Sequence, residues 1–231
     1  EKKTMNYGYF DNEKREYVII NPKTPTPWNN YIGNGKFGGI VSNTGGGLTF
    51  DSDPSNRRVT RYKFNNQPMD RPGRYIYIRD EESKDYWSAT WQPVMKETQK
   101  YECRHGLGYT TIHGEYAEIK SKVTYCVPLG KRYELWDVSL KNRSEKKRVL
   151  KVYSYVEFSF HDAKWDMLAH WPCMALRADY EGNRIVMDTC AEQLAGTPLY
   201  DYIAASIPVC GFDCDMTKFI GQYRSESNPQ V

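Results

Sequence analysis

Four side chains that could hold a sugar or a phosphate follow a run of glycines in the first quarter of the chain. They are Arg57, Arg58, Arg61 and Tyr62, at the end of the stretch 38–62. A guanidinium group presents paired N–H donors that match phosphate oxygens or sugar hydroxyls, and a tyrosine ring can stack on a pyranose face. We therefore predict that these four residues bind substrate or support a binding site.

The glycines before them form a pair at Gly38 and a triplet that ends at Gly47. Glycine lets the backbone adopt positive φ and lets another chain or a ligand approach closely. The stretch lacks the spacing and the Lys-Ser/Thr ending of a phosphate-binding P-loop, so it favours a strand–loop–strand unit. The alternative to a binding role is a structural hairpin whose arginines pair with Asp51 and Asp53.

Carboxylates and sulfur ligands offer other chemistry. Asp51 and Glu157 would form the acid and base of a hydrolase if both faced one cleft at a suitable separation, which is a further alternative. His105 stands in a polar turn without an evident carboxylate partner, and we interpret it as structural. Cys210 and Cys214 have a C-x3-C spacing, but no second ligand pair completes a zinc site. We therefore expect no metal and no cofactor.

Tryptophans could supply a stacking surface. Trp28 ends the proline-rich segment 21–27, whose backbone must be extended, and we predict that it binds substrate together with the arginines. The simpler alternative is that Trp28 covers a sheet edge. Trp87 and Trp91 would share one face of a strand. With Trp28 they suggest an alternative function, a freestanding carbohydrate-binding module.

The elements that must position these residues are strands. In 116–127, 133–140 and 149–160, apolar and polar residues alternate with the period of two that marks a sheet with one solvated face. Short polar turns separate the strands, and 211–221 reads as one capped helical turn. The pattern predicts an all-β fold, a large antiparallel β-sandwich with short helical turns, as one domain over 1–231.

Composition narrows the functional classes. The 231 residues include 32 basic and 29 acidic side chains, a net charge of +3, so we expect neither a nucleic-acid partner nor a membrane surface. The beginning of the sequence has no apolar run of a signal peptide, and no segment approaches membrane-spanning length. The six cysteines form no CxxC pair, and we expect most of them to be reduced, buried thiols in a cytoplasmic protein.

Several stretches together resemble a known family. They are 7–11 (YGYFD), 15–19 (REYVI), 24–33 (TPTPWNNYIG), 40–47 (IVSNTGGG), 57–62 (RRVTRY), 91–94 (WQPV), 101–109 (YECRHGLGY), 155–158 (YVEF) and 211–213 (GFD). In this order they resemble the N-terminal domain of the inverting β-glycoside phosphorylases of glycoside hydrolase family 94. Among the members of this family, the sequence is most similar in these motifs to the cellobiose phosphorylases and next to the diacetylchitobiose phosphorylases.

This resemblance implies a large β-sandwich that a helical linker and a catalytic (α/α)6 domain follow. The whole enzyme of such a family transfers a hexosyl group from a β-linked disaccharide or oligosaccharide to inorganic phosphate, and a sugar 1-phosphate results. Phosphate, the co-substrate, takes the place of the base and its activated water, while an aspartate of the barrel is the acid. The resemblance also implies a homodimer, in which the sandwich makes dimer contacts and reaches the rim of the partner's active site.

The chain departs from the family pattern in two respects. It has no helical pattern long enough for the linker or the barrel, so we expect a sandwich truncated at its C-terminal end, without the catalytic domain. We accordingly assign no catalytic residue here and expect the chain to be inactive alone. The segment 161–171 does not resemble the cellobiose enzymes, which leaves the identity of the disaccharide open.

Overall fold

The computed structural model describes residues 6–62, 69–168, 177–188 and 200–230. All strand pairings between its named strands are antiparallel, and the largest sheet has the order β1-β2-β9-β10-β11-β12. Its strands are β1 (Gly8–Asp11), β2 (Glu16–Ile19), β9 (Lys100–Gly106), β10 (Tyr109–Tyr116), β11 (Ile119–Cys126) and β12 (Leu135–Asn142).

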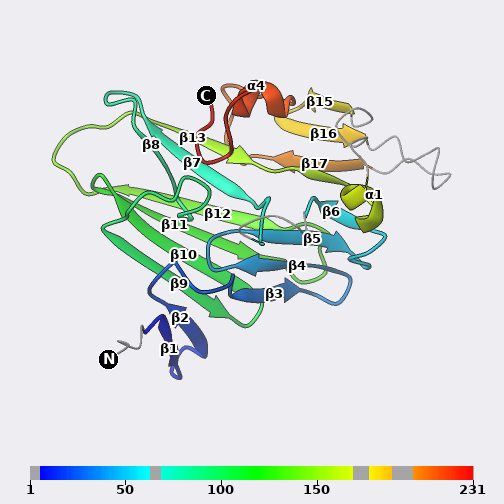
Figure 1. The fold of residues 1–231 in the computed structure, drawn as a ribbon, viewed down its shortest axis with the longest axis horizontal. Coiled ribbons are helices and arrows are strands. Elements are labelled where there is room, and N and C mark those ends of the chain that lie inside the picture. Colours follow the sequence, from blue (N-terminus) through cyan, green and yellow to red (C-terminus); the bar gives the residue numbers. More distant parts are fainter. Residues whose placement is uncertain (1–5, 63–68, 169–176, 189–199, 231) are drawn as a thin grey trace.

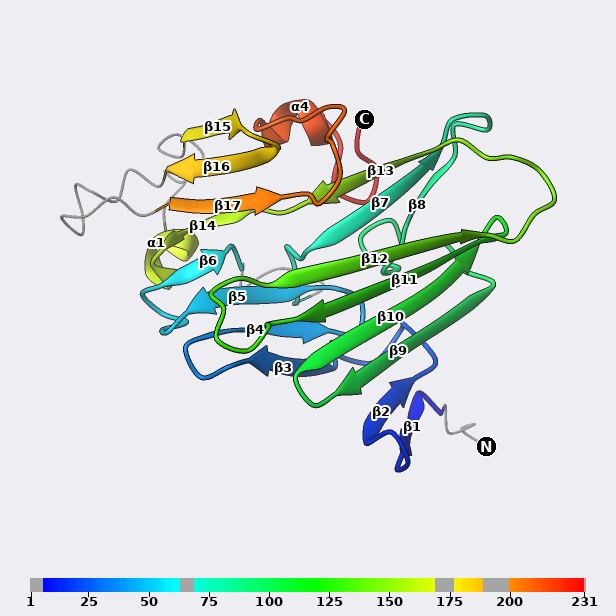
Figure 2. The same ribbon diagram turned by 180° about the vertical axis from the view of Figure 1, so that it is seen from behind.

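Two smaller sheets form the opposite layer. One has the order β14-β6-β5-β4-β3 and the other β13-β7-β8. Their strands are β3 (Asn29–Gly33), β4 (Phe37–Ser42), β5 (Gly47–Asp51), β6 (Arg58–Thr60), β7 (Tyr75–Asp80), β8 (Tyr86–Ser88), β13 (Leu150–Tyr155) and β14 (Phe158–His161). In Figure 2, strands β9–β12 lie in front of β3–β5, and β3 contacts both β10 and β11. The all-β antiparallel fold predicted from the alternating strands is confirmed.

A third sheet and a short helix lie at one end of the molecule (Figure 1), with β17 and α1 beside β14 (Figure 2). The sheet comprises β15 (Arg177–Glu181), β16 (Arg184–Asp188) and β17 (Tyr200–Ala204), and the helix is α1 (Ala163–Leu168). A second short helix, α4 (Met216–Ile220), packs Phe219 and Ile220 against tyrosines of β7 and β13. The predicted helical turn over 211–221 is confirmed as α4, since Asp215 caps its start and Gly221 follows its end. In the described part of the chain, no helix is long and apolar enough to cross a membrane.

The structure corrects two predicted strands. In place of one strand over 116–127, residues 117–118 have φ of 48° and 63° and form the turn between β10 and β11. In place of one strand over 149–160, the chain leaves its sheet after β13 and enters another as β14. At this break the Glu157 carbonyl accepts a hydrogen bond from the N–H of Arg61 at 2.8 Å, which joins the chain to the region beside β6.

The hydrophobic core lies between the two layers. Its buried side chains come from both of them, including Ile19, Cys103, Ile112, Val123 and Tyr125 on one side and Ile32, Val41, Ile78 and Trp87 on the other. On β11 the inward residues alternate with exposed lysines, as the period of two predicted. A large apolar area is thus removed from water, which is the main favourable term in folding.

Arg74, which precedes β7 and is fully buried, joins the two layers by polar contacts. Its Nε lies 2.6 Å from Oε1 of Glu134, the residue before β12. Its guanidinium donates to the carbonyls of Ile40 at 3.0 Å and Leu48 at 2.7 Å, and its own carbonyl accepts from the Tyr125 hydroxyl at 2.8 Å. Because the buried charge is both paired and hydrogen-bonded, the interior can hold it.

The glycine run makes room for buried side chains of the same domain. A Cβ on Gly39 would lie 2.9 Å from Nη2 of Arg74, and a Cβ on Gly46 would lie 2.3 Å from Oδ2 of Asp70. Gly47 has a φ of 114°, which other residues rarely adopt. The close approach that these glycines permit is therefore used by Arg74 and Asp70.

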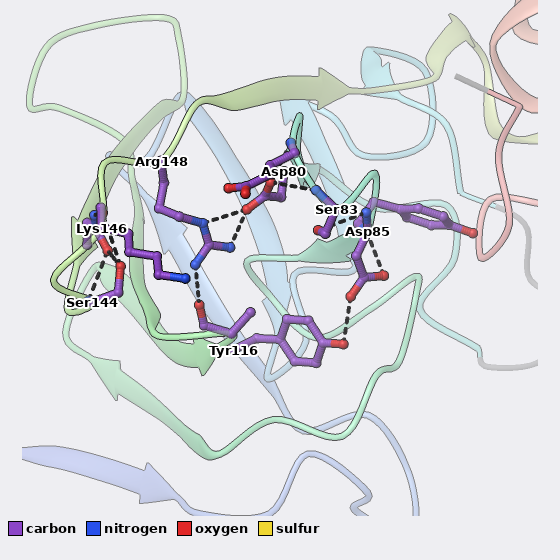
Figure 3. Close-up of polar contacts among 11 residues, drawn as sticks. Asp80, Ser83, Asp85, Tyr116, Ser144, Lys146 and Arg148 are labelled. Carbon is purple, nitrogen blue, oxygen red and sulfur yellow. Dashed lines mark hydrogen bonds and ion pairs between the residues drawn. The ribbon is translucent and has the colours of Figure 1, made fainter.

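A second set of polar contacts joins the ends of neighbouring hairpins (Figure 3). Arg148, just before β13, donates from Nε to Oδ2 of Asp80 at 2.6 Å and from Nη1 to the Ala117 carbonyl at 3.1 Å. The Tyr116 hydroxyl donates to Oδ2 of Asp85 at 2.8 Å. Hydrogen bonds to Asp80 hold the pKa of its carboxyl below the ordinary value, chiefly because Arg148 donates to it. This cluster fixes the relative positions of the β7–β8, β10–β11 and β12–β13 turns.

We expect Glu134→Gln to lower the free energy of unfolding by about 3–5 kcal/mol, because Arg74 would keep a buried charge without its counter-charge. Urea denaturation followed by circular dichroism measures the loss. The matched control is Glu13→Gln in the exposed β1–β2 turn, which should change stability by less than about 0.5 kcal/mol. Equal stability of the two variants would contradict the role assigned to the Arg74–Glu134 pair.

Candidate functional site

The three predicted arginines lie on and beside the hairpin that joins β5 to β6. Asp53 builds this turn, since its carboxylate accepts from the Ser55 N–H at 2.7 Å and from the Asn56 amide at 2.7 Å. The hydrogen bond from Asn56 is the main reason that the pKa of Asp53 lies below its ordinary value. The alternative of a structural hairpin, in which the arginines pair with Asp51 and Asp53, therefore holds in part. Asp51 pairs with arginines, whereas Asp53 stabilises the turn itself.

Arg57 presents its guanidinium to solvent, with 45% of its side chain exposed. Its Nη2 lies 3.7 Å from Oδ2 of Asp51, and Arg132 also donates to that carboxylate. Burial alone would raise the pKa of Asp51, but the hydrogen bonds from Arg132 and Ser52 and the charges of both arginines hold it below its ordinary value. Asp51 is therefore a charged carboxylate near neutral pH, which does not suit the proton donor of a hydrolase.

Arg58 lies in the opposite environment, with 4% of the residue exposed. Its Nε donates to the Pro54 carbonyl at 3.1 Å. Burial lowers its pKa, and the negative charge of Asp166 on α1 opposes that shift. The Asp166 carboxylate accepts in turn from the Ser159 hydroxyl and from the Phe160 N–H, so α1 is fastened to β14. Arg58 thus lies within the packing between the hairpin and α1.

Arg61 and Tyr62 continue into a partly buried region. Nη1 of Arg61 lies 3.6 Å from Oε2 of Glu157, and the Tyr155 hydroxyl donates to Oε1 of Glu157 at 2.8 Å. Burial raises the pKa of Tyr62. Since Asp51 and Glu157 are each held by arginine, the structure gives no support to the acid/base hydrolase.

Trp28 packs against the edge of the core. Its ring lies between Tyr7 and Tyr17, with centroid distances of 5.8 and 5.7 Å. The backbone N–H of Trp28 donates to Oδ1 of Asn43 at 3.0 Å. This contact pattern agrees with the sheet-edge alternative for Trp28. Trp87 is 2% exposed, so it cannot stack on a sugar, and the predicted surface of three tryptophans is wrong for Trp87.

His105 is structural, as predicted. Its Nδ1 lies 3.0 Å from Oγ1 of Thr110 and its Nε2 lies 3.0 Å from the Trp28 carbonyl. Burial lowers the pKa of the imidazole. With both ring nitrogens engaged inside the sandwich, His105 has no free position for acid or base chemistry.

Sequence reasoning missed a buried pair formed by His161 and Asp201. His161 ends β14 with a φ of 64°, and its Nε2 lies 3.3 Å from Oδ2 of Asp201 on β17. Burial and the charge of Asp51 raise the pKa of Asp201 to about 7, while burial lowers the pKa of His161. Both shifts favour the neutral forms of the two groups. The sequence did contain one indication of this pair. The residues of β17 alternate between more and less exposed positions, and Asp201 shares the less exposed face with Ile203.

One end of the β5–β6 hairpin therefore gathers groups from four parts of the chain. They are Asp51, Arg57, Arg132, His161 and Asp201. An exposed guanidinium beside fixed carboxylates can bind hydroxyl groups as donor and acceptor. Within the described ranges, no group of three His, Cys, Asp or Glu residues could hold a metal ion.

The free cysteines of the described residues agree only in part with the prediction of buried thiols. Cys103 is buried and Cys126 partly buried, but Cys210 and Cys214 are exposed. The last two lie in the polar segment before α4. Cys173 and Cys190 lie outside the described residues.

The sequence matches the family model of the Glycosyl hydrolase 94 supersandwich domain over residues 15–231. The chain therefore belongs to this family, and the resemblance predicted from its motifs is confirmed. It is 40% identical over 228 residues to N,N'-diacetylchitobiose phosphorylase of Vibrio proteolyticus. It is 31% identical over 234 residues to solabiose phosphorylase of Paenibacillus borealis.

These alignments cover 97% and 96% of this chain but 28% and 29% of the two relatives. The chain thus spans less than a third of the length of the relatives it matches. A third relative, 3-O-beta-D-glucopyranosyl-beta-D-glucuronide phosphorylase of Paenibacillus borealis, is 38% identical over 148 residues, 64% of this chain and 18% of that protein. The chain corresponds to the part of such phosphorylases that the supersandwich family model describes.

The raised pKa of Asp201 predicts a dependence of stability on pH. The folded chain keeps a proton on Asp201 that the unfolded chain releases, so this residue's contribution to the free energy of unfolding falls as pH rises from about 4 to about 7. Relative to Asp201→Asn, the wild-type chain should lose on the order of 2 kcal/mol between about pH 5 and about pH 8. Denaturation at both pH values measures this difference.

The control is Asp137→Asn on the exposed face of β12, whose stability should follow the wild type at both pH values. Parallel pH profiles for wild type and Asp201→Asn would contradict the assigned protonation.

Proposed function

We propose that this chain is the supersandwich part of an inverting β-glycoside phosphorylase. Such an enzyme cleaves a β-linked disaccharide with inorganic phosphate and releases a sugar 1-phosphate. The family match over residues 15–231 carries this proposal. The names of the relatives, which include phosphorylases of diacetylchitobiose and solabiose, support a saccharide substrate.

In this proposal, the chemistry belongs to a catalytic (α/α)6 domain that this chain accompanies. The described side chains support such a division, because Asp51 and Glu157 are both occupied by arginines of the sandwich. The acid would be an aspartate of the barrel, and inorganic phosphate would attack the anomeric carbon from the opposite face. Phosphate is then the co-substrate, and no other cofactor is needed.

We propose that the sandwich contributes dimer contacts and part of the active-site rim in a cytoplasmic homodimer. The five predicted substrate-binding residues differ in their access to solvent. Arg57 has the most exposed side chain of the three arginines and is our candidate for contact with a saccharide hydroxyl. Arg58, Arg61, Tyr62 and Trp28 would then act by holding the hairpin and the neighbouring sheet edge. The four free cysteines of the described residues support a reducing compartment.

The first test is phosphorolysis. A longer protein that carries this sequence together with the barrel should release sugar 1-phosphate from N,N'-diacetylchitobiose or, as the motif resemblance suggests, from cellobiose. The highly purified 231-residue chain should release none under the same conditions. Turnover by the chain alone, or no phosphate-dependent cleavage of any β-linked disaccharide by the longer protein, would contradict the proposal.

The second test separates contact from support among the arginines. In the longer protein, Arg57→Ala should raise KM for the disaccharide about 2–10-fold, because one charge-assisted hydrogen bond is lost, and should leave Tm nearly unchanged. Arg58→Ala should instead lower Tm by several degrees, since it removes a buried side chain under α1. Arg143→Ala in the exposed β12–β13 loop is the control and should alter neither quantity. An unchanged KM for Arg57→Ala would remove Arg57 from the proposed rim.

A further inference from the structure

Trp91 occupies a strained backbone position at the surface. It follows β8 with a φ of 72°, in the left-handed region that costs a non-glycine residue on the order of 1 kcal/mol. Its neighbours Thr90 and Gln92 are buried, whereas Trp91 itself is partly exposed. A glycine or an asparagine would adopt this backbone conformation at lower cost. The backbone conformation therefore does not explain why a tryptophan stands at this position.

The surrounding loop holds Trp91 rigidly. Its carbonyl accepts from the Met95 N–H at 2.8 Å, and the Thr90 hydroxyl donates to the Gln92 carbonyl at 3.0 Å. The Gln92 side chain accepts from Nε of Arg71 at 3.3 Å. These contacts fix the backbone that carries the indole, so the loop loses little conformational entropy when a ligand binds there.

Trp91 lines an open cavity of about 470 Å³. This volume falls in the range of about 300–1,000 Å³ that is usual for small-molecule sites. Polar groups from two other segments line the same cavity, and they include Asn21, Lys23, Glu97, Gln99 and Lys100. Lys23 pairs with Glu97 across the opening, so these two charges cancel.

The chemistry of this lining matches a neutral sugar chain. A pyranose with equatorial hydroxyls presents an apolar C–H face that can stack on an indole, while its hydroxyls need donors and acceptors at the edge. Amide and charged side chains around Trp91 supply both kinds of group. Lys23 pairs with Glu97, and Nζ of Lys100 lies 3.9 Å from Oε2 of Glu115, so each lysine of the lining has a carboxylate partner and a neutral ligand suits the cavity.

We propose that the cavity at Trp91 is a binding site for neutral β-linked oligosaccharides, with the indole as the stacking surface and the Gln99 side chain as a hydrogen-bonding group. The proposal concerns binding by this chain and does not require phosphorolysis. It also differs from the platform of three tryptophans, since Trp28 and Trp87 pack within the sandwich.

Calorimetry with the 231-residue chain tests the site, with chitotetraose and cellotetraose as probes. We expect measurable binding of at least one probe and an affinity at least about fivefold lower in Trp91→Asn. Asparagine tolerates the left-handed backbone, so this variant should keep the wild-type Tm within a few degrees. The matched control is Tyr223→Asn, which removes an aromatic ring that is 93% exposed and does not line the cavity, and it should bind as the wild type does.

A second readout uses the wild-type chain. In a ¹H–¹⁵N spectrum, the indole signal that is missing from Trp91→Asn identifies Trp91, and the probe should shift this signal and a side-chain amide of the cavity. Absence of binding by the wild-type chain at about 10 mM probe, or equal binding by Trp91→Asn, would overturn the site. Phosphorolysis by the longer protein is measured separately, so failure of this site and failure of the proposed function are distinguishable.

Discussion

The buried ion pair between Arg74 and Glu134 is the interaction on which the rest of the domain depends. It joins the layer that contains β7 to the layer that contains β12, and the same guanidinium donates to backbone carbonyls of the glycine-rich strands β4 and β5. A guanidinium can do so because it carries five donors in a rigid fork. The cost of burying its charge is met by Glu134, and the space that it needs is provided by Gly39.

The arginines of the hairpin after β5 lie in different environments although they are neighbours in the sequence. Arg57 points to solvent and meets Asp51, whereas the next residue, Arg58, is buried beside α1. Successive side chains in extended backbone face opposite directions, so neighbours in sequence enter different environments. His161 and Asp201 then complete the same end of the molecule from β14 and β17. The exposed and the buried halves of this hairpin therefore lie in different environments, one at the surface and one packed beneath α1.

The carboxyl groups near the hairpin differ in their environments. Arg132 and Arg57 hold Asp51 in its charged form, whereas burial favours the protonated form of Asp201. The aromatic residues follow the same division. Many of them, such as Trp87 and Tyr125, fill the core, and Trp91 is held at a cavity by a strained and well-anchored loop. Strain of this kind persists where the surrounding contacts over-determine the backbone.

The sequence by itself determined the fold class, the family and the existence of most strands, because the period of two and the motifs are local properties of the chain. It also determined the α4 turn through Asp215 and Gly221. Only the tertiary structure decided that the predicted strand 149–160 belongs to two sheets, that Glu134 faces the interior and that His161 meets Asp201. These outcomes depend on which distant segments come together, and burial and charge pairing arise from that packing and not from the residue types alone.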